Sequence, residues 1–116
     1  MAHSAGAALR FGIDPQKLEA IWNYRTSSLY TEAERVALDF ALAAASQPND
    51  VSDELFMRMK EHWNEDQIVE ILGVIALFGF TNRWNDSLAT PLEEEPSEAA
   101  VKHLAKQGWS IGKHRG

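Results

Sequence analysis

The side chains best suited to chemistry in this sequence are its histidines, because an imidazole exchanges a proton near neutral pH. The sequence contains His3, His62, His103 and His114. No two of them share a helix face at a spacing typical of metal ligands, so we expect no metal site. His62 ends an expected helix, where a cation suits the helix dipole, and we expect His103 and His114 at the surface. His3 differs because the small residues around it leave room beside its imidazole.

A second candidate site is a polar run that directly follows the most apolar stretch of the chain. The run comprises Asn82, Arg83, Trp84, Asn85 and Asp86. Arg83 could bind the carboxylate of a small acid, with Asn82 and Asn85 setting its orientation and Trp84 beside it. The alternative, which we favour, is structural: Arg83 pairs with a buried acid, Glu34 or Asp39, and Trp84 packs.

Other patterns that carry chemistry are missing or have simpler interpretations. The sequence has no cysteine, which excludes thiol peroxidase, disulfide exchange and cysteine–zinc chemistry for these residues. It has no glycine-rich phosphate loop and no serine nucleophile elbow, and we expect no cofactor. We expect Glu93-Glu94-Glu95 to be a solvated loop rather than a metal site. The tryptophans could line a ligand pocket, but aromatic residues at helical spacing are more often core; they are Trp22, Trp63, Trp84 and Trp109.

Composition limits the class of protein further. The net charge of −6 argues against nucleic-acid binding, which depends on clustered Lys and Arg. The most apolar run, residues 68–80, is too short to cross a bilayer and contains Glu70, and no secretory signal is visible. With its 116 residues we therefore expect a single domain over 1–116, without membrane contact and in the cytoplasm.

The pattern of apolar residues and caps predicts an all-α fold of about six helices. The opening residues 1–12 are typical of the second half of a helix, since Gly12 is suited to a left-handed cap but no residue caps the start. Later helices are expected to begin after capping residues, some with a capping-box partner three residues on. These caps are Asp14, Thr31, Ser52, Asn64 and Ser97, with Glu34 and Gln67 as box partners.

The longest expected helix runs from Asn64 to about Ala89 and is apolar on nearly every face between Ile68 and Phe80. This pattern predicts a buried, central helix. A small monomer cannot easily cover such a helix, so we expect part of it to contact another subunit. In the sixth helix we expect Ala100, Val101 and Leu104 to face inward.

Taken together, these residues resemble the carboxymuconolactone decarboxylase family, in its alkyl hydroperoxidase D-like branch. The resemblance covers nearly the whole chain, and the order and spacing of the matching blocks carry it. The blocks are Ala2-His3-Ser4-Ala5-Gly6-Ala7 with Gly12-Ile13-Asp14, then residues 30–38, 51–56 and 82–86, and the ending Gly108-Trp109-Ser110-Ile111-Gly112-Lys113-His114.

The resemblance implies an all-helical, hydroperoxidase-like bundle that assembles into dimers, trimers or hexamers. It also implies peroxidase and antioxidant chemistry on a peroxide. The redox members carry Cys-x-x-Cys-x-x-x-His: one thiolate attacks the peroxide, the second resolves it as a disulfide, and the histidine belongs to a proton relay. By position His3 resembles that histidine, and the two cysteines would lie just ahead of Met1.

Three explanations fit the missing cysteines. Met1 is an internal methionine of a longer reading frame, or the protein is a natural short form that assembles without the chemistry. We favour these two over the third, in which the protein does cysteine-free work as the decarboxylase branch does on a lactone acid. There His3 would be the acid–base group and Arg83 would hold the carboxylate. A non-catalytic module for oligomerisation or small-acid binding remains a hypothesis from a different class.

Overall fold

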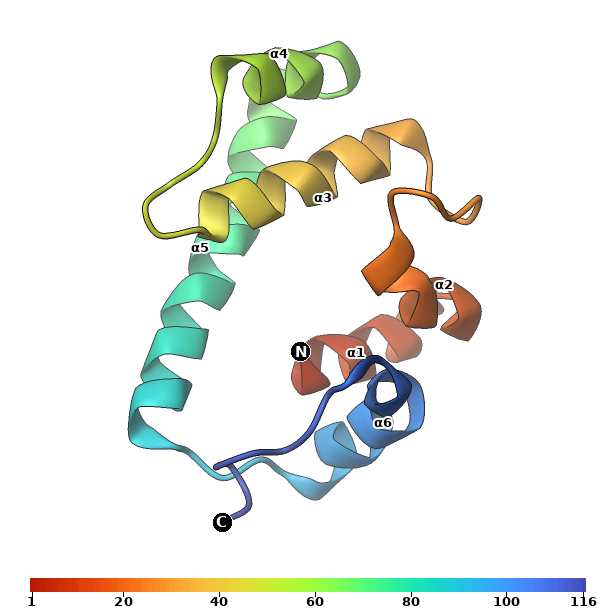
Figure 1. Ribbon diagram of the computed structural model, residues 1–116, viewed down its shortest axis with the longest axis vertical. Helices are drawn as coiled ribbons and strands as arrows, with labels where there is room; N and C mark the ends of the chain where they lie inside the picture. The colour runs from red at the N-terminus through yellow and green to blue at the C-terminus, as the bar shows by residue number, and fades with distance from the viewer. The chain divides into compact units, whose positions relative to one another are not determined.

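Every regular element of the chain is helical in the computed structural model, which describes residues 1–116 (Figure 1). The α-helices are α1 (Ala2–Arg10), α2 (Pro15–Glu19), α3 (Glu32–Ala45), α4 (Asp53–His62), α5 (Glu65–Leu88) and α6 (Glu94–Leu104). Two short 3-10 helices, η1 (Ala20–Asn23) and η2 (Ala105–Gln107), follow α2 and α6. The predicted all-α class is confirmed. No helix has the length and apolar character needed to cross a bilayer.

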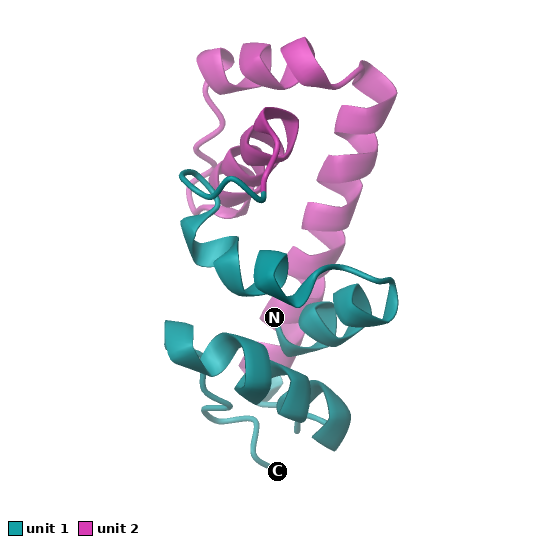
Figure 2. Ribbon diagram, turned by 90° about the vertical axis from the view of Figure 1, so that its right-hand side faces the viewer, with its two compact units in different colours: residues 1–29, 88–116 teal, residues 30–87 magenta.

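The chain divides into two compact units, which Figure 2 colours separately. Unit 1 joins both ends of the sequence, residues 1–29 and 88–116, and unit 2 is the continuous segment 30–87. Unit 1 therefore depends on contacts between residues far apart in the sequence, whereas unit 2 contains neighbouring helices. A single domain over 1–116 stays a prediction.

The helix ends follow the predicted capping chemistry closely. At the end of α1, Gly12 has φ 85°, its N–H donates to Leu9 O, and the Ile13 N–H donates to Ala8 O. This is the Schellman arrangement, which a glycine makes without steric cost. At the start of α2 the Asp14 carboxylate accepts from the Gln16 N–H, with Pro15 as the first helical residue.

The two predicted capping boxes are both present in unit 2. Before α3, Thr31 Oγ1 accepts from the Glu34 N–H while the Glu34 carboxylate accepts from the Thr31 N–H. Before α5, Asn64 and Gln67 make the same reciprocal pair at 3.0 and 2.8 Å. Each box satisfies two backbone donors that a helix start would otherwise leave unpaired.

Unit 1 has a core of small side chains between α1 and α6. Ala2 and Ala5 on α1 pack with Ala100 and Leu104 on α6, and all four are buried. Leu18, Leu92 and Trp109 pack against this cluster from its edges. The alanines allow the two helices to approach closely, and Figure 1 shows α1 and α6 side by side.

Unit 2 has a core of larger side chains drawn from α3, α4 and the start of α5. Val36, Phe40, Met59 and Ile68 form its buried cluster. Trp63 lies at the edge of this cluster and donates from Nε1 to Ala33 O at 3.1 Å.

The prediction that α5 is a buried central helix is wrong for this chain. Only Ile68 is buried, and Ile71 and Ile75 on the same face pack partly against the unit 2 cluster. The other faces expose large apolar side chains, namely Val69, Leu72, Val74, Leu77, Phe78, Phe80, Trp84 and Leu88. The sequence pattern is apolar all round, but unit 2 supplies neighbours for one face of the first three turns.

Two details of α6 also differ from expectation. The helix begins after Glu93 rather than Ser97, because Pro96 falls in the first turn, where its missing N–H costs no helical hydrogen bond. Its inward face carries His103 in place of Val101, which is exposed. Val101 was predicted to face inward because it is apolar, but His103, three residues after Ala100, lies on the same helix face as Ala100.

Candidate functional site

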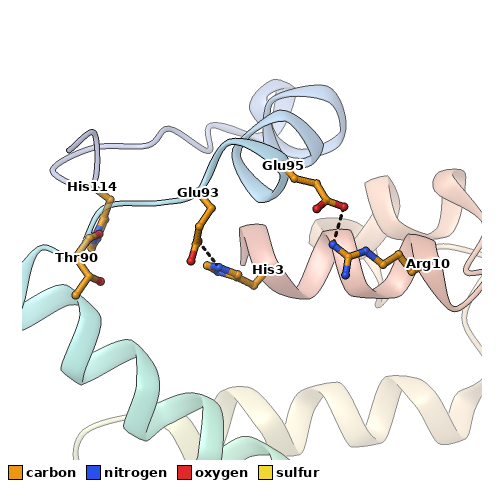
Figure 3. Close-up of polar contacts among 6 residues, drawn as sticks. All are labelled: His3, Arg10, Thr90, Glu93, Glu95 and His114. Atoms are coloured by element: carbon orange, nitrogen blue, oxygen red, sulfur yellow. Dashed lines mark hydrogen bonds and ion pairs between the residues drawn. The ribbon is translucent and has the colours of Figure 1, made fainter.

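His3 lies in the first turn of α1, and its side chain reaches across to the start of α6. His3 Nε2 is 2.7 Å from Glu93 Oε2 (Figure 3). Ala2 and Ala5, on either side of His3, are buried against α6 and so hold this turn close to Glu93. Both polar side chains are mostly exposed, so the pair lies at the surface of unit 1 with the apolar cluster beneath it.

Glu93 is the residue immediately before α6, and several contacts favour its charged form. A hydrogen bond from its own backbone N–H lowers the pKa of the Glu93 carboxyl, and the hydrogen bond and charge of His3 lower it further. Its position at the positive end of the α6 dipole acts in the same direction. Glu93 is therefore a carboxylate at neutral pH and accepts a hydrogen bond from His3.

A second polar pair joins the same two helices further along. Arg10 Nη2 donates to Glu95 Oε1 at 2.6 Å, and Figure 3 shows Arg10 and His3 extending from one side of α1 toward α6. The predicted loop at residues 93–95 is therefore wrong, although all three glutamates are exposed as predicted. These residues form the cap and first turn of α6, and two of the three glutamates bind α1 side chains.

The chemistry available at this site is proton transfer by a single imidazole. Glu93 occupies one ring nitrogen of His3, which leaves Nδ1 to give or take a proton. The Glu93 carboxylate contacts the ring and can orient it, as an acidic side chain does for a catalytic histidine. No group of three or more His, Cys, Asp or Glu side chains in the structure is placed to hold a metal ion.

Two of the other histidines, His103 and His114, have structural partners. The prediction that His103 is a surface residue is wrong: it is buried in unit 1, and its Nδ1 lies 2.9 Å from Glu19 Oε1. That carboxylate compensates for burying a polar ring. His114 is half-buried and donates from Nδ1 to Thr90 O at 2.7 Å (Figure 3). His62 is the last residue of α4, as predicted.

The polar run predicted as a binding site lies in the last turns of α5, in unit 2. Arg83, Asn82 and Asn85 are exposed. Arg83 makes no ion pair or hydrogen bond, so its predicted pairing with Glu34 or Asp39 is wrong. Trp84 is 59% exposed, and its ring lies 6.2 Å from that of Phe80, one helical turn earlier.

Asp39 instead pairs with Arg58 of α4, whose Nη2 lies 3.6 Å from Asp39 Oδ2. The carboxylate-binding interpretation of the run stays a prediction. His3 belongs to unit 1 and this run to unit 2, so we treat them as separate candidate sites.

Glu93, the partner of His3, could not be predicted from the sequence. The two residues are 90 positions apart, and no spacing rule connects them. A weaker signal was present, since three consecutive glutamates directly before a helix are typical of a negatively charged first turn. The buried position of His103 could have been found, because Ala100, His103 and Leu104 follow helical spacing.

Comparisons with known proteins relate this chain to longer proteins. No protein-family model matches the sequence. The chain is 32% identical over 77 residues to the uncharacterized protein YnjA of Escherichia coli (strain K12). The aligned region covers 66% of this chain and 42% of that protein.

Among solved structures the chain is similar to the debrominase Bmp8. A cysteine-to-alanine variant of Bmp8 in complex with 2,3,4-tribromopyrrole has a TM-score of 0.81 and 33% identity, covering 87% of this chain and 54% of that one. The apo structure has a TM-score of 0.74 and 29% identity, covering 87% and 60%. The chain thus spans about half the length of the relatives it matches.

Proposed function

We propose that this chain belongs to the carboxymuconolactone decarboxylase family, in its alkyl hydroperoxidase D-like lineage, and that His3 is its acid–base group. The observation that carries the proposal is the His3–Glu93 pair at 2.7 Å, at the position where the resemblance places the relay histidine. The helical fold and the match of the family-like blocks support it. We place the protein in the cytoplasm, in an antioxidant or related role.

The geometry of α1 suits this role. Residues four and seven positions before His3 would lie on the same face of a continued helix, one and two turns away. The His3 side chain leans toward the N-terminal end of α1, toward those positions. In the redox members a thiolate attacks the peroxide oxygen, the O–O bond breaks, and the departing alkoxide takes a proton, while the resulting sulfenic acid condenses with the second thiol to a disulfide and water.

These 116 residues contain no thiol, so they do not perform that reaction by themselves. We expect the purified chain to show no peroxide-dependent oxidation of a dithiol such as dithiothreitol. Peroxide turnover by the purified chain, above the rate without protein, would contradict this part of the proposal.

A gain-of-function experiment tests the lineage itself. Extending α1 by two helical turns, with cysteines four and seven residues before His3, should produce turnover of hydrogen peroxide when dithiothreitol is supplied to reduce the disulfide after each cycle. The matched control carries serines at the same two positions and should be inactive. A folded two-cysteine protein without turnover would count against a hydroperoxidase-like site at His3.

The second candidate function is binding of a small molecule without catalysis. The specific observation is that a Bmp8 variant lacking one cysteine still holds 2,3,4-tribromopyrrole, so in that similar protein the complex does not need that thiol. We propose 2,3,4-tribromopyrrole as the first probe, with unsubstituted pyrrole as control. Chemical-shift changes in this protein with the bromopyrrole but not with pyrrole would support binding. No change at the highest soluble concentration of the bromopyrrole would contradict it.

A carboxylate-binding version of this module would use Arg83, with Asn82 and Asn85. A small aromatic acid such as benzoate should then raise the melting temperature, and Arg83→Ala should abolish the rise. Arg58→Ala is the matched control, because Arg58 already pairs with Asp39. Equal rises in both variants would contradict a role for Arg83.

We also propose that the working form is a homo-oligomer, a dimer, trimer or hexamer, formed through α5. Phe80 is 62% exposed and Trp84 is 59% exposed. For side chains of this size, each leaves about 100 Å² of aromatic surface in solvent. Apolar surface that continues along a whole helix is typical of an interaction site. A second copy of the chain presents the same apolar surface in return, which a symmetric interface requires.

A further inference from the structure

The carboxylate of Glu93, at the start of α6, contacts only one of the two ring nitrogens of His3. Glu93 Oε2 lies 2.7 Å from Nε2, and no polar contact reaches Nδ1. A carboxylate offers only acceptor atoms, and a neutral imidazole carries one N–H and one lone pair. The N–H must therefore be at Nε2 for the contact to be a hydrogen bond.

We propose that Glu93 is a positioning residue that holds neutral His3 in the Nε2–H tautomer, so that Nδ1 is the atom that takes up and releases the proton. This inference deepens the proposed function and rests on it for its catalytic meaning. It names the reacting atom of His3 and a second residue, 90 positions away in the sequence, on which that atom depends.

The packing of unit 1 explains why Glu93 can hold the ring. Its backbone is fixed as the residue that begins α6, and α6 is fixed to α1 by the buried cluster of Ala2, Ala5, Ala100 and Leu104. The lowered pKa of Glu93 keeps its carboxyl ionised, and so acceptor-only, at neutral and alkaline pH.

The Arg10–Glu95 pair supplies a matched control. It joins the same two helices at 2.6 Å and also uses an exposed glutamate in the first turn of α6. Arg10 is seven residues, or about 10 Å, further along α1 than His3. Removing Glu95 therefore removes a comparable surface contact between the helices without touching the imidazole.

The ring nitrogen resonances of His3 test the proposal directly. In the natural chain, labelled with ¹⁵N and measured at about pH 9, where a histidine is ordinarily neutral, Nε2 should give a pyrrole-like and Nδ1 a pyridine-like resonance. In Glu93→Ala the two resonances should move toward each other, because both tautomers become populated. Glu95→Ala should leave them unchanged.

Glu93→Gln provides a second variant in case alanine loosens the start of α6. Its amide can donate as well as accept, so it should shift the two resonances in the same direction by a smaller amount. Resonances of His3 that stay the same in both Glu93 variants would overturn the proposal, as would a pyridine-like Nε2 in the natural chain.

This readout needs neither cysteine nor peroxide, so it fails or succeeds independently of the proposed function. A fixed Nε2–H tautomer with no peroxide turnover in the two-cysteine protein would keep the assignment of Glu93 and remove the hydroperoxidase-like role. Turnover together with an unchanged tautomer in Glu93→Ala would do the reverse.

Discussion

Units 1 and 2 are both helical, but they are held together in opposite ways. Unit 1 packs alanines between α1 and α6 and closes the surface above them with the polar pairs His3–Glu93 and Arg10–Glu95. Unit 2 packs large side chains around Met59 and leaves most of α5 apolar and exposed. The proposed proton-transfer group, His3, therefore lies in unit 1, and the proposed assembly surface on α5 lies in unit 2.

Removing volume from the unit 2 core should have the largest effect on stability. Met59 is fully buried among Val36, Phe40 and Ile68, so Met59→Ala leaves a cavity and should lower the free energy of unfolding by about 2–5 kcal/mol. Urea unfolding measures this loss. Met57→Ala, on the exposed side of the same helix, should change stability by less than about 0.5 kcal/mol.

A similar loss in the two methionine variants would show that the core of unit 2 is not organised around Met59. It would remove the contrast between a large-residue core in unit 2 and a small-residue core in unit 1.

The next largest effect concerns assembly through α5. Phe80 is 62% exposed, so Phe80→Asp should leave each subunit folded but weaken self-association more than tenfold, as expected for an aromatic residue central to an interface. Analytical ultracentrifugation over a range of concentrations measures the change. Asn82→Asp adds the same charge two residues away without removing apolar surface, and its effect should be smaller.

A natural chain that sediments as a monomer at every concentration would contradict the assembly role of α5. Equal weakening by Phe80→Asp and Asn82→Asp would indicate that charge, rather than apolar contact, decides association.

Unit 1 should be destabilised by enlarging a buried side chain, whereas unit 2 is destabilised by shortening one. Ala100 is fully buried where α6 meets α1, so Ala100→Leu should push the helices apart and cost about 1–3 kcal/mol. Val101→Leu adds a methylene at the exposed neighbouring position and should cost almost nothing. Amide hydrogen exchange should show lost protection in α1 and α6 of the Ala100 variant; full protection there would argue against close alanine packing.

The stability of the two units should depend on pH in opposite directions. We expect this effect to be smaller than that of the core substitutions. Burial, and then the charge of Glu34, raise the pKa of Tyr30 in unit 2 above 10.0, so its contribution is present below pH 10 and is lost as the pH rises through the folded pKa. The pKa of Glu93 in unit 1 is lowered below 4.5, so its contribution is present above pH 4.5 and is lost as the pH falls through the folded value.

Amide exchange followed against pH distinguishes the two units. Tyr30→Phe should remove the alkaline loss in α3, and Glu93→Gln should remove the acid loss in α6. The assignment of Tyr30 to the alkaline loss and of Glu93 to the acid loss would be contradicted by the opposite pattern. In that pattern Tyr30→Phe would remove the loss of protection at low pH, or Glu93→Gln would remove the loss at high pH.

The same contrast explains what the sequence could predict. The caps of α2, α3, α4 and α5 were predicted because each depends on residues two or three positions apart. The pairs that build unit 1 join residues 84 to 90 positions apart, and no local pattern specifies them. His3 could be chosen from its neighbours, but its partner Glu93 could not.

The exposure of α5 shows a different limit. A helix that is apolar all round must be covered, and the sequence pattern shows this requirement without showing which surface meets it. Within this chain only the face of Ile68, Ile71 and Ile75 is covered. The interpretation of Arg83 as a structural ion pair failed for a related reason, because Asp39 had a nearer partner in Arg58.

Whether His3 is the acid–base group is tested most directly in the protein whose α1 carries the two added cysteines. The measurement is the rate of disulfide formation after a pulse of hydrogen peroxide, compared between that protein and its His3→Gln variant. Loss of a general acid–base should lower the rate by about a hundredfold or more, while Glu95→Gln should leave it unchanged. Equal rates with His3 and with glutamine in its place would contradict the assignment.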